Sequence, residues 1–321
     1  MTTTAAESKA KRVAVLVGCN YANTPHELHG CINDVVAMRD TLLARFGFDP
    51  ALVSLLTDAP DSPVQPTGQN IKSELRRVVG GAAPGDVLYF HYSGHGTLVP
   101  SHHHYRKDEA IVPSDFNLIT DVDFRDLVNR LPKGASLTIL SDSCHSGGLI
   151  DKEKEQIGPT SADRGRTTRV LGGRPRSIPF ESIVGHLASA SGIASAHIGD
   201  HLSHLFGDEA SPKLTNRREV GGAQGVVGPD DGILLSGCQA DETSADMPPS
   251  MGAGKSYGAF SYAVRTVLGS QPGPLTNRDL VSRARALLRK QGFEQHPCLY
   301  CSDHNADAVF LAQPPPAPHS D

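Results

Sequence analysis

The chain has no tryptophan, only six cysteines and no excess of basic residues among its 321 positions. Six cysteines are too few for a disulfide scaffold in a chain of this length, so we expect them to be reduced. The formal net charge of −5, without a basic stripe interleaved with aromatic residues, argues against nucleic acid as a partner. No apolar run approaches the length of about 18 residues that a membrane span needs. The polar first twelve residues lack a signal-peptide pattern, so the expected compartment is the cytoplasm.

The first half of the sequence alternates between short apolar runs and helical patterns. Strands are expected at Arg12–Cys19, Leu52–Thr57, Asp86–Tyr92 and Ser136–Ser141. Helices are expected between them, at Cys31–Phe46, Asn70–Val79 and Asp121–Asn129. This alternation is typical of an α/β fold in which helices cover both faces of a mostly parallel sheet.

The composition changes at about Asp151. Residues 159–179 are rich in Ser, Thr, Arg and Gly and lack apolar periodicity, which predicts a flexible exposed loop. After a short helix at Phe180–Ala190, a polar, glycine-rich stretch continues to about Asp231. Later elements are expected as a strand at Gly232–Gly237, helices at Ser256–Leu268 and Asn277–Gln291, and strands at Pro297–Cys301 and Ala308–Leu311. The predicted organisation is a large portion (1–151), a linker (152–231), a small portion (232–313) that completes the same sheet, and a disordered tail (314–321).

Two motifs carry the chemistry of the chain, H-Y-S-G-H-G at His91–Gly96 and S-D-S-C-H-S-G-G at Ser141–Gly148. Each follows a predicted strand, and the carboxyl ends of parallel strands meet at one edge of a sheet. Cys144 can therefore act as a nucleophile with His95 as its acid–base partner. The backbone N–H groups of Gly94 and Cys144 are the expected donors to an oxyanion. The pairing predicts acyl transfer through a thioester.

Carboxylates near this pair indicate which substrates it would accept. Asp142 lies two residues before Cys144, so the two side chains project to the same side of an extended chain. Asp34 follows the first strand at the same sheet edge, and Ser93 offers a hydroxyl. Two converging carboxylates would select a basic residue before the scissile bond. The alternative for Asp34 is an ordinary residue of a helix first turn.

Several motifs together resemble the type II metacaspases, a caspase-like family of αβα fold. They are G-C-N-Y, H-G-C-I-N-D-V, H-Y-S-G-H-G, S-D-S-C-H-S-G-G-L-I-D and S-G-C-Q-A-D-E-T-S-A-D. The resemblance covers nearly the whole chain, from Val13 to about Leu311. The resemblance implies a cysteine endopeptidase that cuts after Arg, with Lys second, and that takes part in programmed cell death. It implies a Cys144–His95 dyad and a basic-residue pocket lined by Asp34, Ser93 and Asp142. Asp241 is expected near that pocket.

The resemblance also bears on cofactors. Many metacaspases need Ca²⁺, held by an acidic loop, but here that loop is Ser101–Lys107, S-H-H-H-Y-R-K, which is basic. Weak calcium candidates remain at Asp108, Asp121, Asp123 and Asp151. The sequence resembles the calcium-independent plant metacaspase 9 subgroup, which favours mildly acidic pH, so no cofactor is expected. The pocket carboxylates are expected to stay ionised at pH of about 5–6.

The linker resembles a maturation site of that subgroup. The stretch R-S-I-P-F predicts self-cleavage between Arg176 and Ser177, which makes the chain a zymogen whose large and small subunits stay associated. The expected partners are protein or peptide substrates with Arg or Lys before the cut, with protein inhibitors as a further class. The bland interpretation is that the linker arginines only solubilise a loop.

Four other interpretations stay open. A calcium-dependent enzyme or a non-catalytic scaffold could use the same fold, although the scaffold would not need the intact pair and pocket acids. A zinc protein could use His296, Cys298, Cys301 and His304, although an extended strand alternates its side chains between two faces. Cleavage after Asp or Asn is disfavoured by the acidic pocket.

Overall fold

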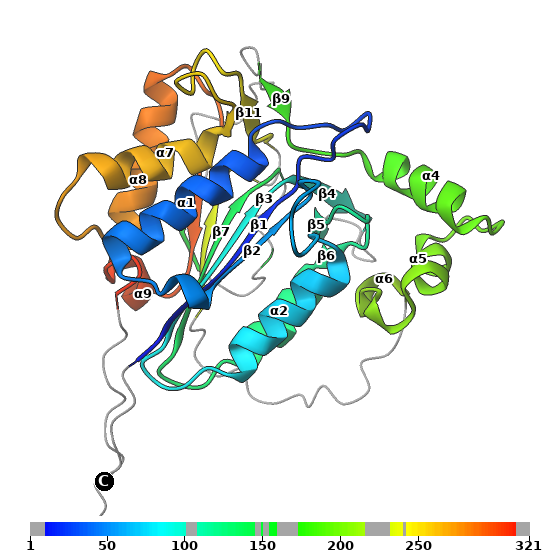
Figure 1. Ribbon diagram of the computed structural model, residues 1–321, viewed down its shortest axis with the longest axis horizontal. Helices are drawn as coiled ribbons and strands as arrows, with labels where there is room; N and C mark the ends of the chain where they lie inside the picture. Colours follow the sequence, from blue (N-terminus) through cyan, green and yellow to red (C-terminus); the bar gives the residue numbers. More distant parts are fainter. Residues whose placement is uncertain are drawn as a thin grey trace, which may run out of the picture.

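The structure is a computed structural model, and it describes residues 10–100, 108–144, 149, 154–158, 173–215, 232–239 and 242–312. Its centre is a seven-stranded sheet with helices on both faces (Figure 1). In spatial order the strands are β2 (Val53–Thr57), β1 (Arg12–Gly18), β3 (Val87–Ser93), β7 (Ser136–Asp142), β10 (Gly232–Ser236), β13 (Cys298–Tyr300) and β8 (Glu155–Ile157). The first five strands pair in parallel, whereas β13 pairs antiparallel with β10 and β8. The mostly parallel α/β sheet predicted from the sequence is confirmed.

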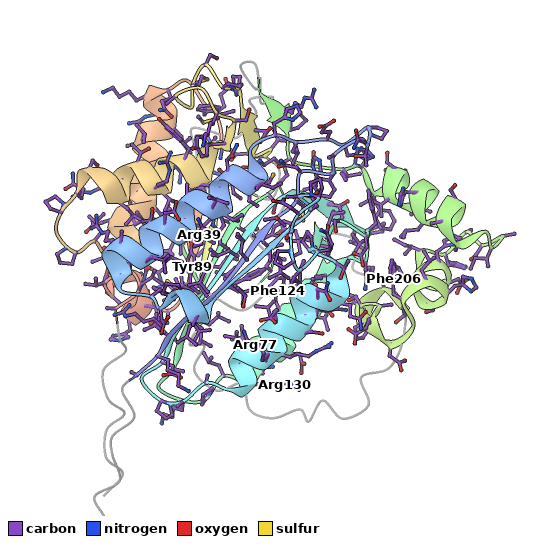
Figure 2. The ribbon with its side chains drawn as sticks, in the orientation of Figure 1. Arg39, Arg77, Tyr89, Phe124, Arg130 and Phe206 are labelled. Atoms are coloured by element: carbon purple, nitrogen blue, oxygen red, sulfur yellow. The ribbon has the colours of Figure 1, made fainter. Side chains whose placement is uncertain are left out.

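The inner strands are apolar along their length because both faces of the sheet are buried. In β1, Val15 and Val17 pack into the core on one face, and Leu16 packs into the core on the other. Figure 2 labels one aromatic side chain from each core, Phe124 and Tyr89. The alternation of side chains along each strand thus supplies two cores at once.

Three helices cover one face of the sheet and two cover the other, since their apolar residues divide between the two cores. The first group is α1 (Cys31–Phe46), α7 (Ala259–Ser270) and α8 (Asn277–Lys290), and the second is α2 (Gly68–Gly80) and α3 (Asp121–Asn129). Thr67 begins α2 by accepting the N–H of Asn70 at 3.2 Å, and Gly47, at φ 65°, ends α1 in the left-handed conformation. Short helices η1 (Pro50–Leu52) and α9 (Asp303–Asp307) complete these layers.

Two small three-stranded sheets accompany the central sheet. One consists of β4 (His95–Val99), β5 (Asp108–Val112) and β6 (Ile119–Thr120); the other consists of β12 (Tyr257–Gly258), β11 (Ala245–Met247) and β9 (Arg174–Pro175). Only Gly94 separates β4 from β3, so the chain turns sharply at the carboxyl end of β3. The sequence did not predict these strands, because each has two to five residues, which is too short for a clear periodicity.

The described part of the linker from residue 180 to residue 215 forms a helical arm beside β4–β6 (Figure 1). It contains α4 (Phe180–Ser191), α5 (Ile198–Phe206), η2 (Gly207–Glu209) and α6 (Pro212–Thr215). The sequence predicted only a polar, glycine-rich stretch after residue 190, with no helix, and α5, η2 and α6 correct this for the arm. Ile183 and Leu187 of α4 and Leu202 of α5 are buried in the core of the α2–α3 face, so a few well-placed apolar residues suffice to fold it.

One further prediction is wrong near the end of the described chain. Residues 308–311 do not form a strand, because α9 ends at Asp307 and only Val309 pairs, in an isolated bridge with Thr276. Phe310 and Leu311 are buried from a turn instead. Within the described ranges, no helix is long and apolar enough to cross a membrane.

Candidate active site

The two sequence motifs leave the central sheet side by side. Strand β3 ends at Ser93 and β7 ends at Asp142, and these two residues are register partners in the parallel ladder. His95 and Cys144 follow within two residues of these ends, and both are buried. The two motifs therefore lie at the same edge of the parallel sheet, as the sequence predicted.

Arg176 belongs to the linker, and its side chain occupies a pocket beside Cys144 and His95. The Arg176 side chain is 0% exposed, so the prediction that residues 159–179 form an exposed loop is wrong at this position. Its Nη1 donates to Ser93 Oγ at 2.8 Å and to the Asp142 backbone oxygen at 2.9 Å. Its Nη2 donates to Asp34 Oδ2 and to Asp246 Oδ1, both at 2.9 Å. The guanidinium thus uses both of its terminal nitrogens in a pocket made by separate parts of the chain.

The carboxylates of the pocket are held by further hydrogen bonds, as buried charges require. Asp34 accepts the Gly258 N–H at 2.9 Å and the Ser93 hydroxyl at 2.7 Å. Asp142 accepts the hydroxyl of Ser244 at 2.5 Å, and its other oxygen lies 3.5 Å from Arg176 Nη1. These contacts fix three acids around one cation.

Burial raises the pKa of Asp34 to about 7, although the Arg176 guanidinium opposes this shift. The ion pair with Arg176 favours the charged form of Asp34, whereas burial favours the protonated form. The expectation that the pocket carboxylates stay ionised at pH of about 5–6 stays a prediction.

The backbone around Arg176 is held like an added strand. Arg174 and Pro175 pair antiparallel with β11, and the Arg176 N–H donates to the Ser244 backbone oxygen at 2.9 Å. Beyond Arg176, the Ile178 N–H donates to the Gly96 oxygen at 3.1 Å. The segment is therefore extended across the site, with its carbonyl carbon at the centre.

The carbonyl oxygen of Arg176 accepts two N–H groups, from Gly96 at 3.0 Å and from Cys144 at 3.1 Å. The second donor is the predicted one, but the first is Gly96 and not Gly94. Gly94 packs against tyrosines, since a Cβ there would lie 2.5 Å from the Tyr92 hydroxyl. A Cβ at Gly96 would lie 1.8 Å from the Cys144 backbone oxygen, so only glycine lets these two segments approach.

Within the described part of the chain, one of the two His95 ring nitrogens has a hydrogen-bond partner and the other has none. Nε2 lies 2.7 Å from the backbone oxygen of His26; a carbonyl oxygen can only accept, so Nε2 carries the proton. Nδ1 is buried and has no hydrogen-bond partner among the described residues, which leaves its lone pair available. Burial lowers the pKa of His95 to about 4, so the ring is neutral at ordinary pH.

The Cys144 sulfur is fully buried and accepts the Ser244 N–H at 3.0 Å. Among the described residues, no hydrogen bond joins Cys144 to His95. The backbone of Arg176 interacts with both residues: its oxygen accepts the Cys144 N–H, and it favours the charged form of the His95 ring. Ser244 is a link in this site, because its oxygen, N–H and hydroxyl each bind a different site residue. Sequence reasoning missed Ser244.

Sequence reasoning also missed Asp246, the third acid of the pocket. It belongs to the same D-E-T-S-A-D run as Asp241, which was predicted instead and lies outside the described residues. Asp246 accepts the backbone N–H groups of His29 and Gly30 at 2.9 and 3.0 Å. The acidic run indicated that the pocket lies near this stretch, but it did not indicate that Asp246 contacts Arg176.

Two of the weak calcium candidates, Asp108 and Asp121, form ion pairs with a lysine. Lys213 Nζ lies 2.6 Å from Asp121 Oδ1 and 2.9 Å from Asp108 Oδ2. Asp123 instead accepts the Thr120 N–H and the Ser211 hydroxyl. The fourth candidate, Asp151, lies outside the described residues. The part of the chain that the structure describes contains no group of three or more His, Cys, Asp or Glu side chains arranged to hold a metal.

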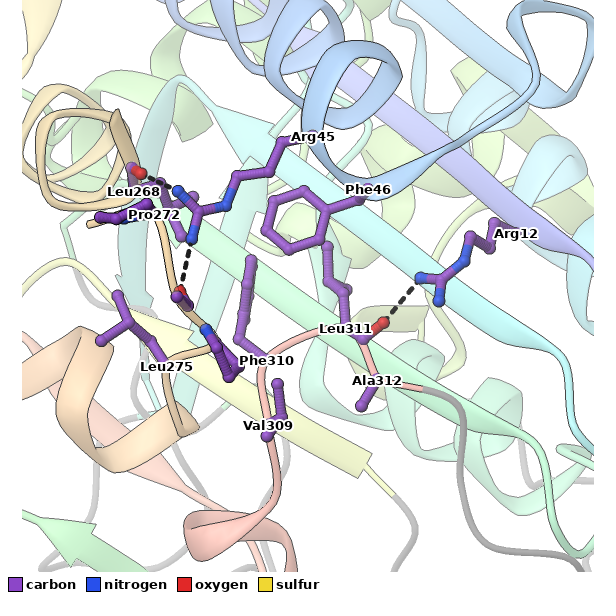
Figure 3. Close-up of a pocket in the computed structure, with 12 residues that line it drawn as sticks. Arg12, Arg45, Phe46, Leu268, Pro272, Leu275, Val309, Phe310, Leu311 and Ala312 are labelled. Carbon is purple, nitrogen blue, oxygen red and sulfur yellow. Dashed lines mark hydrogen bonds between the residues drawn. The ribbon is translucent and has the colours of Figure 1, made fainter. Parts of the chain in front are cut away.

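The proposed zinc ligands have other contacts. His296 Nδ1 lies 2.5 Å from Glu242 Oε1, and the Cys298 thiol donates to the His296 oxygen at 3.3 Å. A separate cavity of about 310 Å³, drawn in Figure 3, is lined by Arg12, Arg45 and apolar residues including Phe46 and Phe310. It contains none of the candidate catalytic or pocket residues.

Comparisons with known proteins agree on one family. Residues 11–309 match the model of the caspase domain. The chain is 56% identical to metacaspase-9 of Arabidopsis thaliana over 322 residues, covering 95% of this chain and 98% of that protein. It is 39% identical to metacaspase-6 of the same plant, covering 93% and 99% of the two chains.

Solved structures agree on the fold. Protein GSU0716 of Geobacter sulfurreducens matches 95% of this chain and 100% of its own, with a TM-score of 0.64 at 18% identity. Caspase-1 of Spodoptera frugiperda matches 95% of this chain and 91% of its own, with a TM-score of 0.50 at 10% identity. At such low identity the likeness concerns the fold alone.

Proposed function

The chain belongs to the caspase-domain family and, within it, to the type II plant metacaspases, which are cysteine-type peptidases; from this premise we propose an endopeptidase that cuts after arginine, with lysine second. It is made as a zymogen that cuts itself between Arg176 and Ser177. The observation that carries this proposal is Arg176 itself, buried among three carboxylates with its carbonyl oxygen on two N–H groups.

The dyad residues take complementary roles. Cys144 attacks the carbonyl carbon of the residue in the pocket, and the N–H groups of Gly96 and Cys144 stabilise the oxyanion that forms. His95 gives the leaving amine its proton, and then removes a proton from the water that hydrolyses the thioester. Nδ1 of His95, for which the described residues offer no hydrogen-bond partner, supports this role.

The pocket supports a ranking of substrates. Arginine presents two terminal nitrogens at a fixed spacing, and here each nitrogen has its own partners. Lysine carries one ammonium group and cannot satisfy both sets at once. An aspartate would meet like charges and leave the pocket acids unpaired.

Calcium independence is part of the proposal. Lys213 supports it, because its ammonium group already lies between two of the candidate carboxylates. A resident cation on the helical arm removes the need for a metal ion to neutralise them.

The self-cleavage site gives the experiment that tests this function. In Arg176→Ala the pocket loses its cation, and we expect no fragment with Ser177 at its N-terminus. Arg176→Lys is expected to be cut more slowly at the same bond. Fragment masses during a time course of purified protein measure both results.

Arg174 provides the matched control, because it is an arginine two residues away whose side chain is exposed. Arg174→Ala is expected to keep the cut after Arg176. Normal maturation of Arg176→Ala at the same bond would contradict the proposal.

The pH dependence of the first cut follows from His95. Its pKa of about 4 keeps the ring neutral at pH 5, so the processing rate of the unprocessed chain should be nearly flat between pH 7 and 5 and should fall below about pH 4. Single-turnover rates, measured after release of a reversible thiol block, test this; a decline centred on pH of about 6.5, the ordinary imidazole value, would contradict it.

A further inference from the structure

The peptide bond between Arg176 and Ser177 is held independently on both sides. On the Arg176 side, the guanidinium and the pairing with β11 hold the acyl part. On the Ser177 side, Ile178 is 1% exposed in the core, and its N–H donates to Gly96. A cut at this bond would therefore leave two anchored ends.

The leaving side is fixed further by the helical arm. The His186 ring of α4 stacks on Phe116, with centroids 4.0 Å apart. The arm makes these polar contacts with the body of the fold: Asn117 Nδ2 to Glu209 O at 3.1 Å, Ser211 Oγ to Asp123 Oδ2 at 2.6 Å, Lys213 Nζ to Asp121 Oδ1 at 2.6 Å, and Lys72 Nζ to the Glu209 oxygen. None of these contacts depends on the Arg176–Ser177 bond, so the arm stays in place after the cut.

The new amine would remain beside the thioester. Water has restricted access there, because Cys144, His95 and Arg176 are buried, while Ser177 is only partly exposed. Well-oriented neighbouring groups can reach effective concentrations of about 10⁵ M or more, far above a free amine in solution. The retained amine can therefore compete with water for the acyl group.

We propose that the enzyme is also a transpeptidase, in which the Ser177 amine accepts acyl groups from the Cys144 thioester. This inference rests on the proposed function, because it needs both the cut after Arg176 and the thioester. The substrates are peptides with a scissile amide bond after arginine as acyl donors, whose amine part leaves when the thioester forms, and N-termini beginning Ser-Ile as acceptors. The first cut of the zymogen is then reversible until hydrolysis releases the Arg176 end.

The bonds and protons of this step balance. In the forward direction, Cys144 Sγ bonds to the acyl carbon, the C–N bond breaks, and the amine takes a proton through His95. In the transfer, the Ser177 nitrogen attacks the thioester carbon, its proton passes to Nδ1 of His95, and the Cys144 thiolate leaves. One peptide bond forms for each thioester consumed, and no other reactant is required.

A donor peptide supplied to the processed enzyme provides the test. Acetyl-Gly-Arg-Pro-Arg linked to aminomethylcoumarin copies residues 173–176 and reports acyl-enzyme formation by coumarin release. We expect the fragment that begins at Ser177 to gain the mass of the acetyl-tetrapeptide acyl group. The adduct should survive hydroxylamine, because it is an amide.

Ile178→Ala removes the apolar anchor of the acceptor. Its ratio of labelled fragment to released coumarin should fall at least about tenfold, as loss of a buried aliphatic side chain predicts. Val64→Ala truncates an exposed aliphatic side chain and should leave the ratio unchanged. A second measurement needs no variant: Ser-Ile-Pro-Phe amide added to the wild type should capture the acyl group, whereas Ser-Asp-Pro-Phe amide should not.

The outcomes separate this inference from the proposed function. Coumarin release with an unlabelled Ser177 fragment and no capture by Ser-Ile-Pro-Phe amide would overturn transpeptidation and leave the peptidase intact. No coumarin release would overturn both. Equal ratios in Ile178→Ala and the wild type would overturn retention of the acceptor by its apolar anchor.

Discussion

Cys144→Ala is expected to leave the chain uncut between Arg176 and Ser177 and to lower peptide hydrolysis at least about 10⁴-fold, as loss of a nucleophile does in other proteases. The physical reason is that the sulfur forms the covalent bond to the acyl group, and alanine offers no atom in its place. The remaining pocket still binds arginine, so substrate binding should persist while turnover stops. Intact mass after prolonged incubation measures processing, and coumarin release measures hydrolysis.

The control for this variant is another buried cysteine. Cys298 lies in β13 and its thiol donates to the His296 oxygen; among the described residues, no hydrogen bond joins its side chain to Cys144, His95 or the pocket acids. Cys298→Ala is expected to be processed and active. Processing of Cys144→Ala at the normal rate would show that another group is the nucleophile.

Asp246→Asn is expected to lower kcat/KM for arginine peptides about 10²-fold. The change keeps the shape of the side chain but removes the negative charge that faces Arg176 Nη2 at 2.9 Å. Breaking one partner of a buried ion pair costs about 3 kcal/mol or more, and each 1.4 kcal/mol corresponds to about tenfold. The preference for arginine over lysine should shrink, because the second guanidinium nitrogen loses a charged partner.

Asp40→Asn makes the same chemical change on the exposed side of α1, where the carboxylate pairs with Arg39 on the surface. Exposed pairs contribute little, so this variant should keep wild-type kinetics. If Asp246→Asn and Asp40→Asn showed equal kinetics on arginine peptides, Asp246 would have no role in binding arginine. The assignment of arginine specificity to the acidic pocket would then lose one of its three acids.

The sequence predicted the parts of the fold that repeat a pattern. The bounds of α1 and α3 match the predictions, since apolar periodicity and a threonine–aspartate start are local signals. Strands β1, β3 and β7 were found because burial on both faces makes continuous apolar runs. These strands also bring Ser93 and Asp142 into register, which is why the candidate site could be assembled from two motifs.

The burial of Arg176, the choice of Gly96 as a donor and the role of Asp246 depend on contacts between distant segments, which local sequence patterns do not predict. The linker reads as exposed because it is polar, yet Arg176 is buried once three acids from distant segments surround it. The choice between Gly94 and Gly96 as donor depends on where β4 turns. Asp246 is held at the pocket by two backbone N–H groups, and no composition pattern records such contacts.

The most direct measurement compares peptides that differ only in Arg, Lys or Asp before the scissile bond, with wild-type enzyme in EGTA and in Ca²⁺. The account predicts cleavage after Arg, slower cleavage after Lys and none after Asp, with equal rates in both buffers. Preferred cleavage after Asp would contradict the acidic pocket. Activity that appears only with Ca²⁺ would contradict the proposal that Lys213 replaces a metal ion beside Asp108 and Asp121.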